Sequence, residues 1–172
     1  MSEYLRGVVQ VPIERKHLAN AQRWARAVAG RYDAEVEVDE PSLYIIIKPG
    51  PNITVDGLLK LRDMARAIAL GFTPEDALAL ENEGYYLDSI DLKEYVPPAH
   101  LPRVKARIIG EDGRAKSAVE GLAGVKIVVG DRRVAFLGPM EAVALAKEAV
   151  LMLIEGRKHS TVYRWLQRAK RG

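Results

Sequence analysis

Cysteine is absent from this sequence of 172 residues. Its absence excludes disulfide frameworks, thiolate metal sites and cysteine nucleophiles, and nothing indicates an oxidising compartment. Long apolar runs are missing too, because none approaches the roughly 18 residues that cross a bilayer. Residues 1–6 lack the apolar centre of a signal peptide. We therefore expect a cytoplasmic protein that does not contact a membrane.

Motifs typical of enzymes are also missing. The sequence has no Walker A loop, no strand-linked GxGxxG and no GxSxG elbow, so nucleotide hydrolysis, dinucleotide chemistry and esterase chemistry have no support. The histidines His17, His100 and His159 lie far apart, without the spacing of zinc ligands. We interpret an acidic stretch as a solvated face rather than a metal site; it contains Glu81, Glu83, Asp88, Asp91 and Glu94. We predict no enzymatic activity, no metal and no cofactor.

The composition, with 48% apolar and 28% charged residues, is that of a folded globular protein. Its charge is unevenly distributed: residues 1–96 contain 11 Lys and Arg against 16 Asp and Glu, whereas residues 97–172 contain 15 against 7. Such a division predicts that the second half binds a polyanion. Aromatic residues make up only 6%, which disfavours a surface where bases stack on rings.

The chain contains an internal repeat of the order strand, helix, strand, strand, helix. In the first copy, the apolar pattern predicts strands over 7–12, 36–39 and 44–47 and helices over 21–30 and 54–70. Next, Thr73 as N-cap, followed by proline and two acidic residues, predicts a short helix over 73–80. That helix closes the first domain.

The second copy follows about 89 positions later, with strands predicted over 86–91, 125–129 and 134–137 and a final helix over 140–155. The pair Pro97-Pro98 then lies inside this copy, as a turn from strand to helix. We therefore place the domains at 1–82 and 83–172. The expected fold class is α+β, with two tandem domains that each consist of a three-stranded sheet covered on one face by helices.

Two glycines interrupt the helical pattern of the second copy, between helices over 103–109 and 114–120. Gly110 and Gly113 allow a tight turn and leave no Cβ to block a phosphodiester, while the next helix presents N–H groups and its positive dipole end. We interpret Gly110–Gly113 as a nucleic-acid-binding loop, with a purely structural turn as the alternative. Gly121–Gly124 has the same spacing, but it leads directly into a strand and is interpreted as a helix C-cap.

The residues around this loop form the candidate binding site. Isoleucines on its flank and on the facing strand, with Val129, are expected to line an apolar groove for unstacked bases, and basic residues are expected to contact phosphates. The candidates are Arg107, Ile108, Ile109, Gly110, Glu111, Asp112, Gly113, Arg114, Lys116, Ile127, Arg132 and Arg133.

The C-terminal tail is a second basic segment, with six Lys and Arg and no acidic residue over 157–172. Its apolar stripe at helical spacing can dock on the domain; the stripe consists of Val162, Trp165, Leu166 and Ala169. The outward-facing residues are candidates for additional contact with RNA or a partner, and they are Arg164, Arg168, Lys170 and Arg171.

The segment Arg107–Gly113, in its place within the second copy, resembles the GXXG segment of type I KH domains, which clamp four backbone nucleotides of single-stranded RNA. Two such units in tandem, the linker Leu70–Leu78 and the tail His159–Leu166 resemble the archaeal small-subunit ribosome assembly factors of the Dim-two or partner-of-Nob-one family. The resemblance spans nearly the whole chain.

This resemblance implies a first KH unit without a GXXG loop that serves as a packing partner; Ala21–Trp24 occupy the loop position, without glycine at either end. It implies a second unit that binds the 3′ region of small-subunit rRNA, with the 3′-end maturation nuclease and an initiation factor subunit as partners. Glu111 and Asp112 depart from the family pattern, in which a basic residue is usual. Two carboxylates near phosphates weaken binding unless they point to solvent or cap the next helix.

The alternative function is a protein-interaction scaffold. In that case the Gly110–Gly113 segment is only a structural turn, and the basic tail binds an acidic partner.

Overall fold

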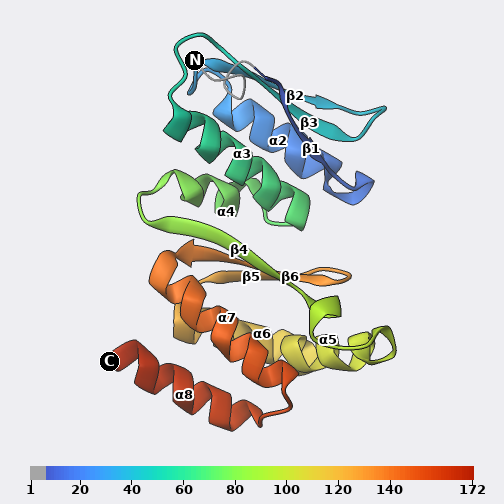
Figure 1. The fold of residues 1–172 in the computed structure, drawn as a ribbon, viewed down its shortest axis with the longest axis vertical. Helices are drawn as coiled ribbons and strands as arrows, with labels where there is room; N and C mark the ends of the chain where they lie inside the picture. The colour runs from blue at the N-terminus through green and yellow to red at the C-terminus, as the bar shows by residue number, and fades with distance from the viewer. Residues whose placement is uncertain (1–6) are drawn as a thin grey trace. The chain divides into compact units, whose positions relative to one another are not determined.

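The computed structural model describes residues 7–172; residues 1–6, in which no signal peptide is expected, lie outside the described part. The chain forms two compact units, the first ending at Glu81 and the second spanning Asn82–Gly172. Each unit contains a three-stranded antiparallel sheet with helices packed against it (Figure 1), which confirms the α+β class. None of the helices in residues 7–172 combines the length and the apolar character that spanning a membrane requires.

The first unit has the predicted order of strand, helix, strand, strand, helix. Its elements are β1 (Val9–Pro12), α2 (Leu18–Val28), β2 (Ala34–Asp39), β3 (Tyr44–Pro49), α3 (Val55–Leu70) and α4 (Pro74–Leu78). β3 is the central strand and pairs antiparallel with β1 and β2. Ile45 and Ile47 of β3 are fully buried, while Glu35 and Glu37 of β2 are exposed, because side chains alternate between the two faces of a sheet.

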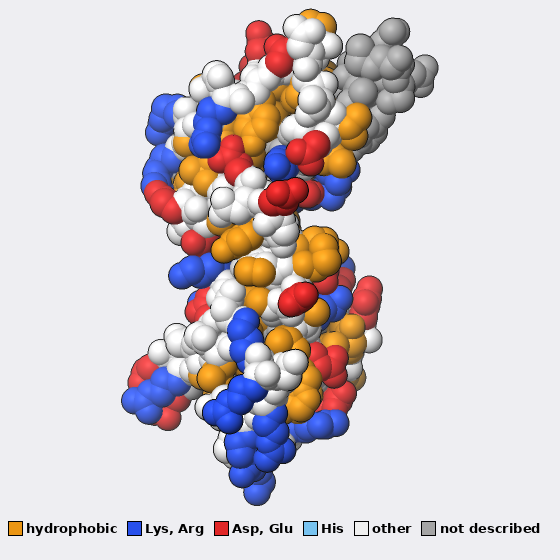
Figure 2. Space-filling view, turned by 90° about the vertical axis from the view of Figure 1, so that its left-hand side faces the viewer, with side chains coloured by type: hydrophobic (Ala, Val, Ile, Leu, Met, Phe, Trp, Pro, Cys, Tyr) orange, Lys and Arg blue, Asp and Glu red, His pale blue; other side chains and the backbone are white. Residues whose placement is uncertain are grey.

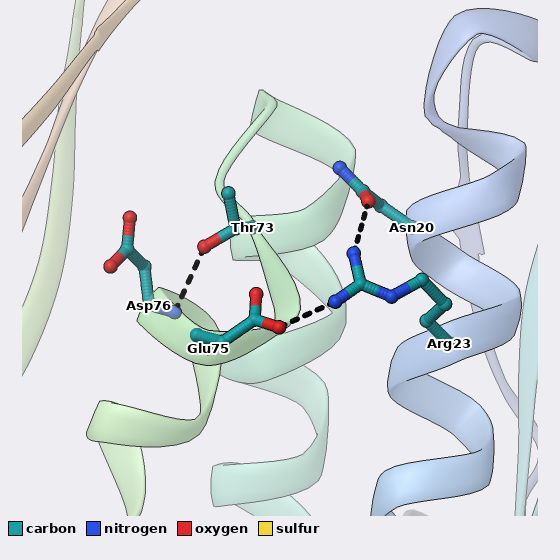
Figure 3. Close-up of polar contacts among 5 residues, drawn as sticks. All are labelled: Asn20, Arg23, Thr73, Glu75 and Asp76. Atoms are coloured by element: carbon teal, nitrogen blue, oxygen red, sulfur yellow. Dashed lines mark hydrogen bonds and ion pairs between the residues drawn. The ribbon is translucent and has the colours of Figure 1, made fainter.

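Two helices of the first unit, α3 and α4, begin at a threonine that caps them. The Thr54 side chain accepts a hydrogen bond from the backbone N–H of Gly57 at 3.0 Å, which starts α3. The Thr73 side chain accepts one from the N–H of Asp76 at 3.1 Å, with Pro74 at the first helical position of α4 (Figure 3). The predicted short helix is therefore present, and the chain continues from it into the 3₁₀ turn Ala79–Glu81.

In the first unit, α2 is continuous through the position where the repeat would place a loop. Ala21 and Trp24 of this helix have no exposed surface. On its outer side, the guanidinium of Arg23 contacts Asn20 and Glu75, so it links α2 to α4 (Figure 3). One unbroken helix therefore replaces the helix, loop and helix of the second unit.

The second unit repeats the sheet of the first with the same strand order. Its elements are β4 (Tyr85–Asp91), α5 (Leu101–Ile109), α6 (Arg114–Ala123), β5 (Lys126–Val129), β6 (Arg133–Pro139), α7 (Met140–Ile154) and α8 (His159–Arg171). β6 is central, between β4 and β5. The Pro97-Pro98 pair lies between β4 and α5, where a short 3₁₀ turn, Pro98–His100, leads into the helix. This is the strand-to-helix turn that the sequence predicts.

Helix α8 forms an outer layer of the second unit. Figure 1 shows it on the side of α6 and α7 that faces away from the sheet, and it packs against both helices. Val162 and Leu166 are fully buried, and Trp165 and Ala169 are half-buried. The predicted docking stripe is therefore confirmed, and the opposite face of α8 is exposed.

Candidate nucleic-acid interface

The predicted break between two helices is present in the second unit. α5 ends at Ile109, the backbone turns over Gly110–Gly113, and α6 begins at Arg114. Positive φ angles occur at Gly110 (77°), Asp112 (56°) and Gly113 (76°). The segment is therefore a separate loop rather than part of one continuous helix.

The two glycines are required for different reasons. A Cβ on Gly110 would lie 2.6 Å from both the Cβ and the backbone nitrogen of Ala115, so the loop packs too closely on α6 for any side chain there. A Cβ on Gly113 would meet no heavy atom within 4 Å. Gly110 therefore closes the loop onto the helix, and Gly113 leaves the backbone open to an approaching molecule.

The two middle residues of the loop point their carboxylates to solvent. Glu111 and Asp112 are exposed, and within residues 7–172 neither carboxylate accepts a hydrogen bond or forms an ion pair. Of the two arrangements considered from the sequence, the solvent-facing one is therefore present. A polyanion can reach the backbone without breaking an ion pair, although both charges weaken its attraction.

The apolar residues expected to line a groove fall into two groups. Ile108 and Ile127 are 1% and 2% exposed and belong to the core of the second unit, whereas Ile109 and Val129 on the same elements are half-buried. Ile109 and Val129 therefore provide the apolar surface that a base can contact. Direct contact between RNA and either Ile108 or Ile127 stays a prediction, one that this burial does not favour.

The two basic residues at the start of α6 differ in whether they have an ionic partner. Arg114 is exposed and forms no ion pair with any described residue. The Nζ of Lys116 lies 3.3 Å from Oε1 of Glu120, and the other carboxylate oxygen of Glu120 accepts a hydrogen bond from the Ile127 N–H at 2.9 Å. Arg114 therefore offers the uncompensated charge nearest to Gly113 on this helix.

Arg107, which the sequence predicts as a phosphate contact, is engaged inside the unit. Its Nε donates to the carbonyl of Leu153 at 3.1 Å, and its Nη2 donates to the carbonyl of Arg157. These carbonyls lie at and just beyond the C-terminal end of α7, where a cation is stabilised by the helix dipole. The side chain therefore ties α5 to α7, and its contact with phosphate stays a prediction.

Replacing this side chain tests the structural role. Arg107→Ala is expected to lower the free energy of unfolding by about 2 kcal/mol, because the hydrogen bonds of a charged group and its packing are lost. Chemical denaturation measures the change. Arg103→Ala, on the exposed side of the same helix, is the control and should change stability by less than about 0.5 kcal/mol. Loss of RNA affinity at unchanged stability would instead assign Arg107 to the phosphates.

Arg132 lies in the turn between β5 and β6, whereas Arg133, expected in the same turn, is the first residue of β6. Arg132 forms an ion pair with Asp91 at 2.5 Å, and this hydrogen bond, with one from the backbone N–H of Lys93, holds the pKa of Asp91 below its usual range. The pair therefore stabilises the folded chain at neutral pH and loses its contribution as acid protonates Asp91. The side chain of Arg133 is exposed and makes no hydrogen bond or ion pair with the described residues.

The four basic candidates on α8 divide in the same way. The Nζ of Lys170 donates to the carbonyl of Ala123 at 2.8 Å, at the end of α6. Arg164, Arg168 and Arg171 are exposed, and no described residue forms an ion pair with them. The three arginines are therefore available to a partner, whereas Lys170 links α8 to the end of α6.

Two residues that matter for the interface were not singled out from the sequence. Glu120 engages both Lys116 and the Ile127 N–H, and its spacing of four from Lys116 was the available signal. His159 donates from Nε2 to the carbonyl of Arg107 at 2.9 Å, which no sequence pattern indicates. In the described part of the chain, no cluster of His, Asp or Glu is arranged to hold a metal ion.

The chain is similar to known KH-domain proteins. A family model described as eukaryotic type KH-domain (KH-domain type I) matches residues 86–171, half of the chain. A KH domain-containing protein of Methanocaldococcus jannaschii is 40% identical over 112 residues, covering 64% of this chain and 49% of that protein. The pre-rRNA-processing protein PNO1 of Coccidioides immitis is 32% identical over 133 residues, covering 75% of this chain and 52% of that protein. The chain thus spans about half the length of the curated relatives it matches.

The similarity to solved structures covers nearly the whole chain. A crystal structure of the a/eIF2alpha–aDim2p–rRNA complex from Pyrococcus horikoshii contains a chain that matches with a TM-score of 0.86 at 30% identity. The match covers 96% of this chain and 94% of that one.

Proposed function

Because the chain belongs to the PNO1/Dim2 family of KH-domain proteins, we propose that it is an RNA-binding factor of ribosome assembly. Its second unit grips single-stranded RNA through the Gly110–Gly113 loop, in the manner of a type I KH domain. The protein acts in the cytoplasm by binding RNA and has no catalytic role.

The observation that carries this proposal is the pair of glycine environments in the loop. Gly110 is packed so closely on Ala115 that it accepts no side chain, and Gly113 exposes the backbone at the start of α6. A sugar-phosphate strand needs such an open backbone, and the N-terminus of α6 supplies a positive dipole for its phosphates. Arg114, directly after the loop and without an ionic partner among the described residues, adds charge to the same site.

The RNA is the 3′ region of small-subunit rRNA. Two findings support this choice: the family resemblance of the sequence, and the presence of rRNA in the similar archaeal complex. That complex also contains an initiation factor subunit, and we extend this partner to the present chain. The 3′-end maturation nuclease is proposed as a further partner on the family resemblance alone.

The first unit is a KH domain that has lost its loop. Its sheet has the same central-strand arrangement, β1-β3-β2 against β4-β6-β5, and its element order differs only where α2 runs unbroken. Trp24 is buried at the position where a loop residue would face RNA. Residues 1–82 contain 10 Lys and Arg against 12 Asp and Glu, so this unit has no excess of positive charge to attract a polyanion.

The decisive variant is Gly113→Asp, measured with a single-stranded RNA of about ten nucleotides from the 3′ end of small-subunit rRNA. A carboxylate at this open position meets the phosphates, so affinity is expected to fall by about tenfold or more, equivalent to about 1.4 kcal/mol. Fluorescence anisotropy in low salt measures the dissociation constant. The variant should still fold, because the new side chain meets no neighbouring atom.

A matched control is Gly124→Asp. Gly124 also has a positive φ, 84°, and a Cβ there meets only the Nζ of Lys170 within 4 Å, at 3.6 Å. It ends α6 instead of starting it, so this variant carries the same charge and backbone strain away from the loop. Equal RNA affinity in both variants would reject the loop as the RNA site and favour a protein-interaction scaffold.

A further inference from the structure

The exposed face of α8 carries a charged stripe outside the loop. Arg164, Arg168 and Arg171 are spaced by four and three positions, so they lie on one face of the helix. Val162 and Leu166, which are fully buried, occupy the opposite face. The three guanidinium groups follow the helix over about 10 Å, at 1.5 Å per residue.

No acidic side chain neutralises this stripe within residues 7–172. Some basic residues of the unit are paired, for example Lys116 with Glu120 and Lys147 with Asp88, whereas the three arginines form no ion pair with any described residue. Figure 2 shows Lys and Arg side chains gathered at the end of the second unit where Figure 1 places α8. The stripe is therefore a site of uncompensated positive charge, which attracts a polyanion.

The stripe is held firmly beside the helices that carry the loop. His159, at the start of α8, donates to the carbonyl of Arg107 in α5 at 2.9 Å, and Lys170, near its end, donates to the carbonyl of Ala123 in α6 at 2.8 Å. α5 and α6 are the helices on either side of Gly110–Gly113. An RNA strand that leaves the loop therefore meets a positively charged helix, α8, that is fixed within the same unit.

We propose that Arg164, Arg168 and Arg171 bind the phosphate backbone of an RNA segment that flanks the nucleotides held by the loop. This inference rests on the proposed RNA-binding function and extends its footprint. Guanidinium groups match phosphate oxygens with two parallel hydrogen bonds, and such contacts do not depend on base sequence.

An acidic protein partner fits the same surface less well. Protein interfaces depend on a buried apolar or aromatic anchor at their centre. No large hydrophobic side chain of α8 is exposed, and the residues between the arginines on this face, such as Gln167, are polar. Charge complementarity without an anchor favours a phosphate backbone.

The test compares the full chain with an Arg164→Gln, Arg168→Gln, Arg171→Gln variant. The probes are the RNA of about ten nucleotides and a single-stranded RNA of about thirty nucleotides with the same 3′ end, each measured over a range of salt. For the long RNA, we expect affinity in low salt to fall by about tenfold or more, and the slope of log K against log salt to decrease in magnitude by about 2. For the short RNA, we expect less than about a threefold change.

The matched control removes three other arginines. Arg15, Arg26 and Arg66 of the first unit are exposed and form no ion pair with described residues, so Arg15→Gln, Arg26→Gln, Arg66→Gln lowers the net charge equally. It should leave both affinities close to those of the unchanged chain. A second variant, Arg164→Lys, Arg168→Lys, Arg171→Lys, keeps the charge and should retain most of the salt slope.

Failure of this inference is distinct from failure of the proposed function. The inference would be overturned if the α8 variant bound the long RNA with the same affinity and salt slope as the control variant. If the α8 variant then lost binding to polyglutamate, the stripe would be assigned to acidic proteins. An equal loss for short and long RNA would also overturn it, because the stripe would belong to the loop site. Gly113→Asp tests the loop separately through the short RNA.

Discussion

Gly110→Ala is expected to destabilise the second unit by about 4 kcal/mol, because two costs combine at this residue. Its backbone, with φ 77° and ψ 170°, lies in a region that is open almost only to glycine and costs other residues about 1–3 kcal/mol. The new Cβ would also stand 2.6 Å from the backbone nitrogen of Ala115. Relief requires the loop to move away from α6, which breaks a packed contact.

The measurement needs a signal from the second unit alone. The chain has two tryptophans, Trp24 in the first unit and Trp165 on α8. The buried indole nitrogen of Trp24 has no hydrogen-bond partner among the described residues, so Trp24→Phe loses no hydrogen bond and leaves Trp165 as the reporter. Urea denaturation followed by fluorescence then gives the free energy of unfolding.

Gly113→Ala serves as the comparison for Gly110→Ala. It adds the same methyl group at a positive φ of 76°, but it meets no neighbour, so it should cost only about 1–2 kcal/mol. Equal effects of the two substitutions would contradict the close packing of Gly110 on α6.

Leu166→Ala is expected to lower the stability of the second unit by about 3 kcal/mol. Leu166 has no exposed surface and belongs to the core cluster that α8 forms with the inner helices. Removing its branched side chain gives up the transfer free energy and leaves a cavity, which together cost about 2–5 kcal/mol for a buried leucine. The same fluorescence assay measures the change.

The outward face of α8 supplies the control for Leu166→Ala. Arg164→Ala changes an exposed residue two positions away and should alter stability by less than about 0.5 kcal/mol. A loss below about 1 kcal/mol for Leu166→Ala would mean that α8 does not contribute to the core of the second unit.

Local signals predicted the secondary structure closely because they act over a few residues. Thr73 and Pro74 start α4 as their types require, and the apolar spacing of Val162 and Leu166 marks the buried side of α8. The loop at Gly110–Gly113 was also recognisable, because two glycines between helical patterns disfavour a continuous helix and permit the positive φ angles of a tight turn. The repeat predicted two sheets, and both are present.

The roles of individual charged side chains were not predictable in the same way. Arg107, Lys116 and Arg132 are as basic as Arg114, yet the structure engages the first with carbonyls near the end of α7 and the other two with carboxylates. The partner of Lys116 lies four positions away on the same helix, but those of Arg107 and Arg132 lie 41 to 50 positions away in the sequence, and only chain folding brings them within hydrogen-bond distance. The same holds for Ile127, whose burial depends on helices that pack over β5.

The amino-acid sequence alone determined the two-unit repeat, the helix ends and the glycine loop, since capping, periodicity and backbone freedom are properties of neighbouring residues. Tertiary structure decided which cations remain available to RNA: Arg114, Arg133 and three arginines of α8 stay unpaired among the described residues, while other candidates support the fold. The physical reason is that availability depends on distant partners, and packing alone determines where those partners lie.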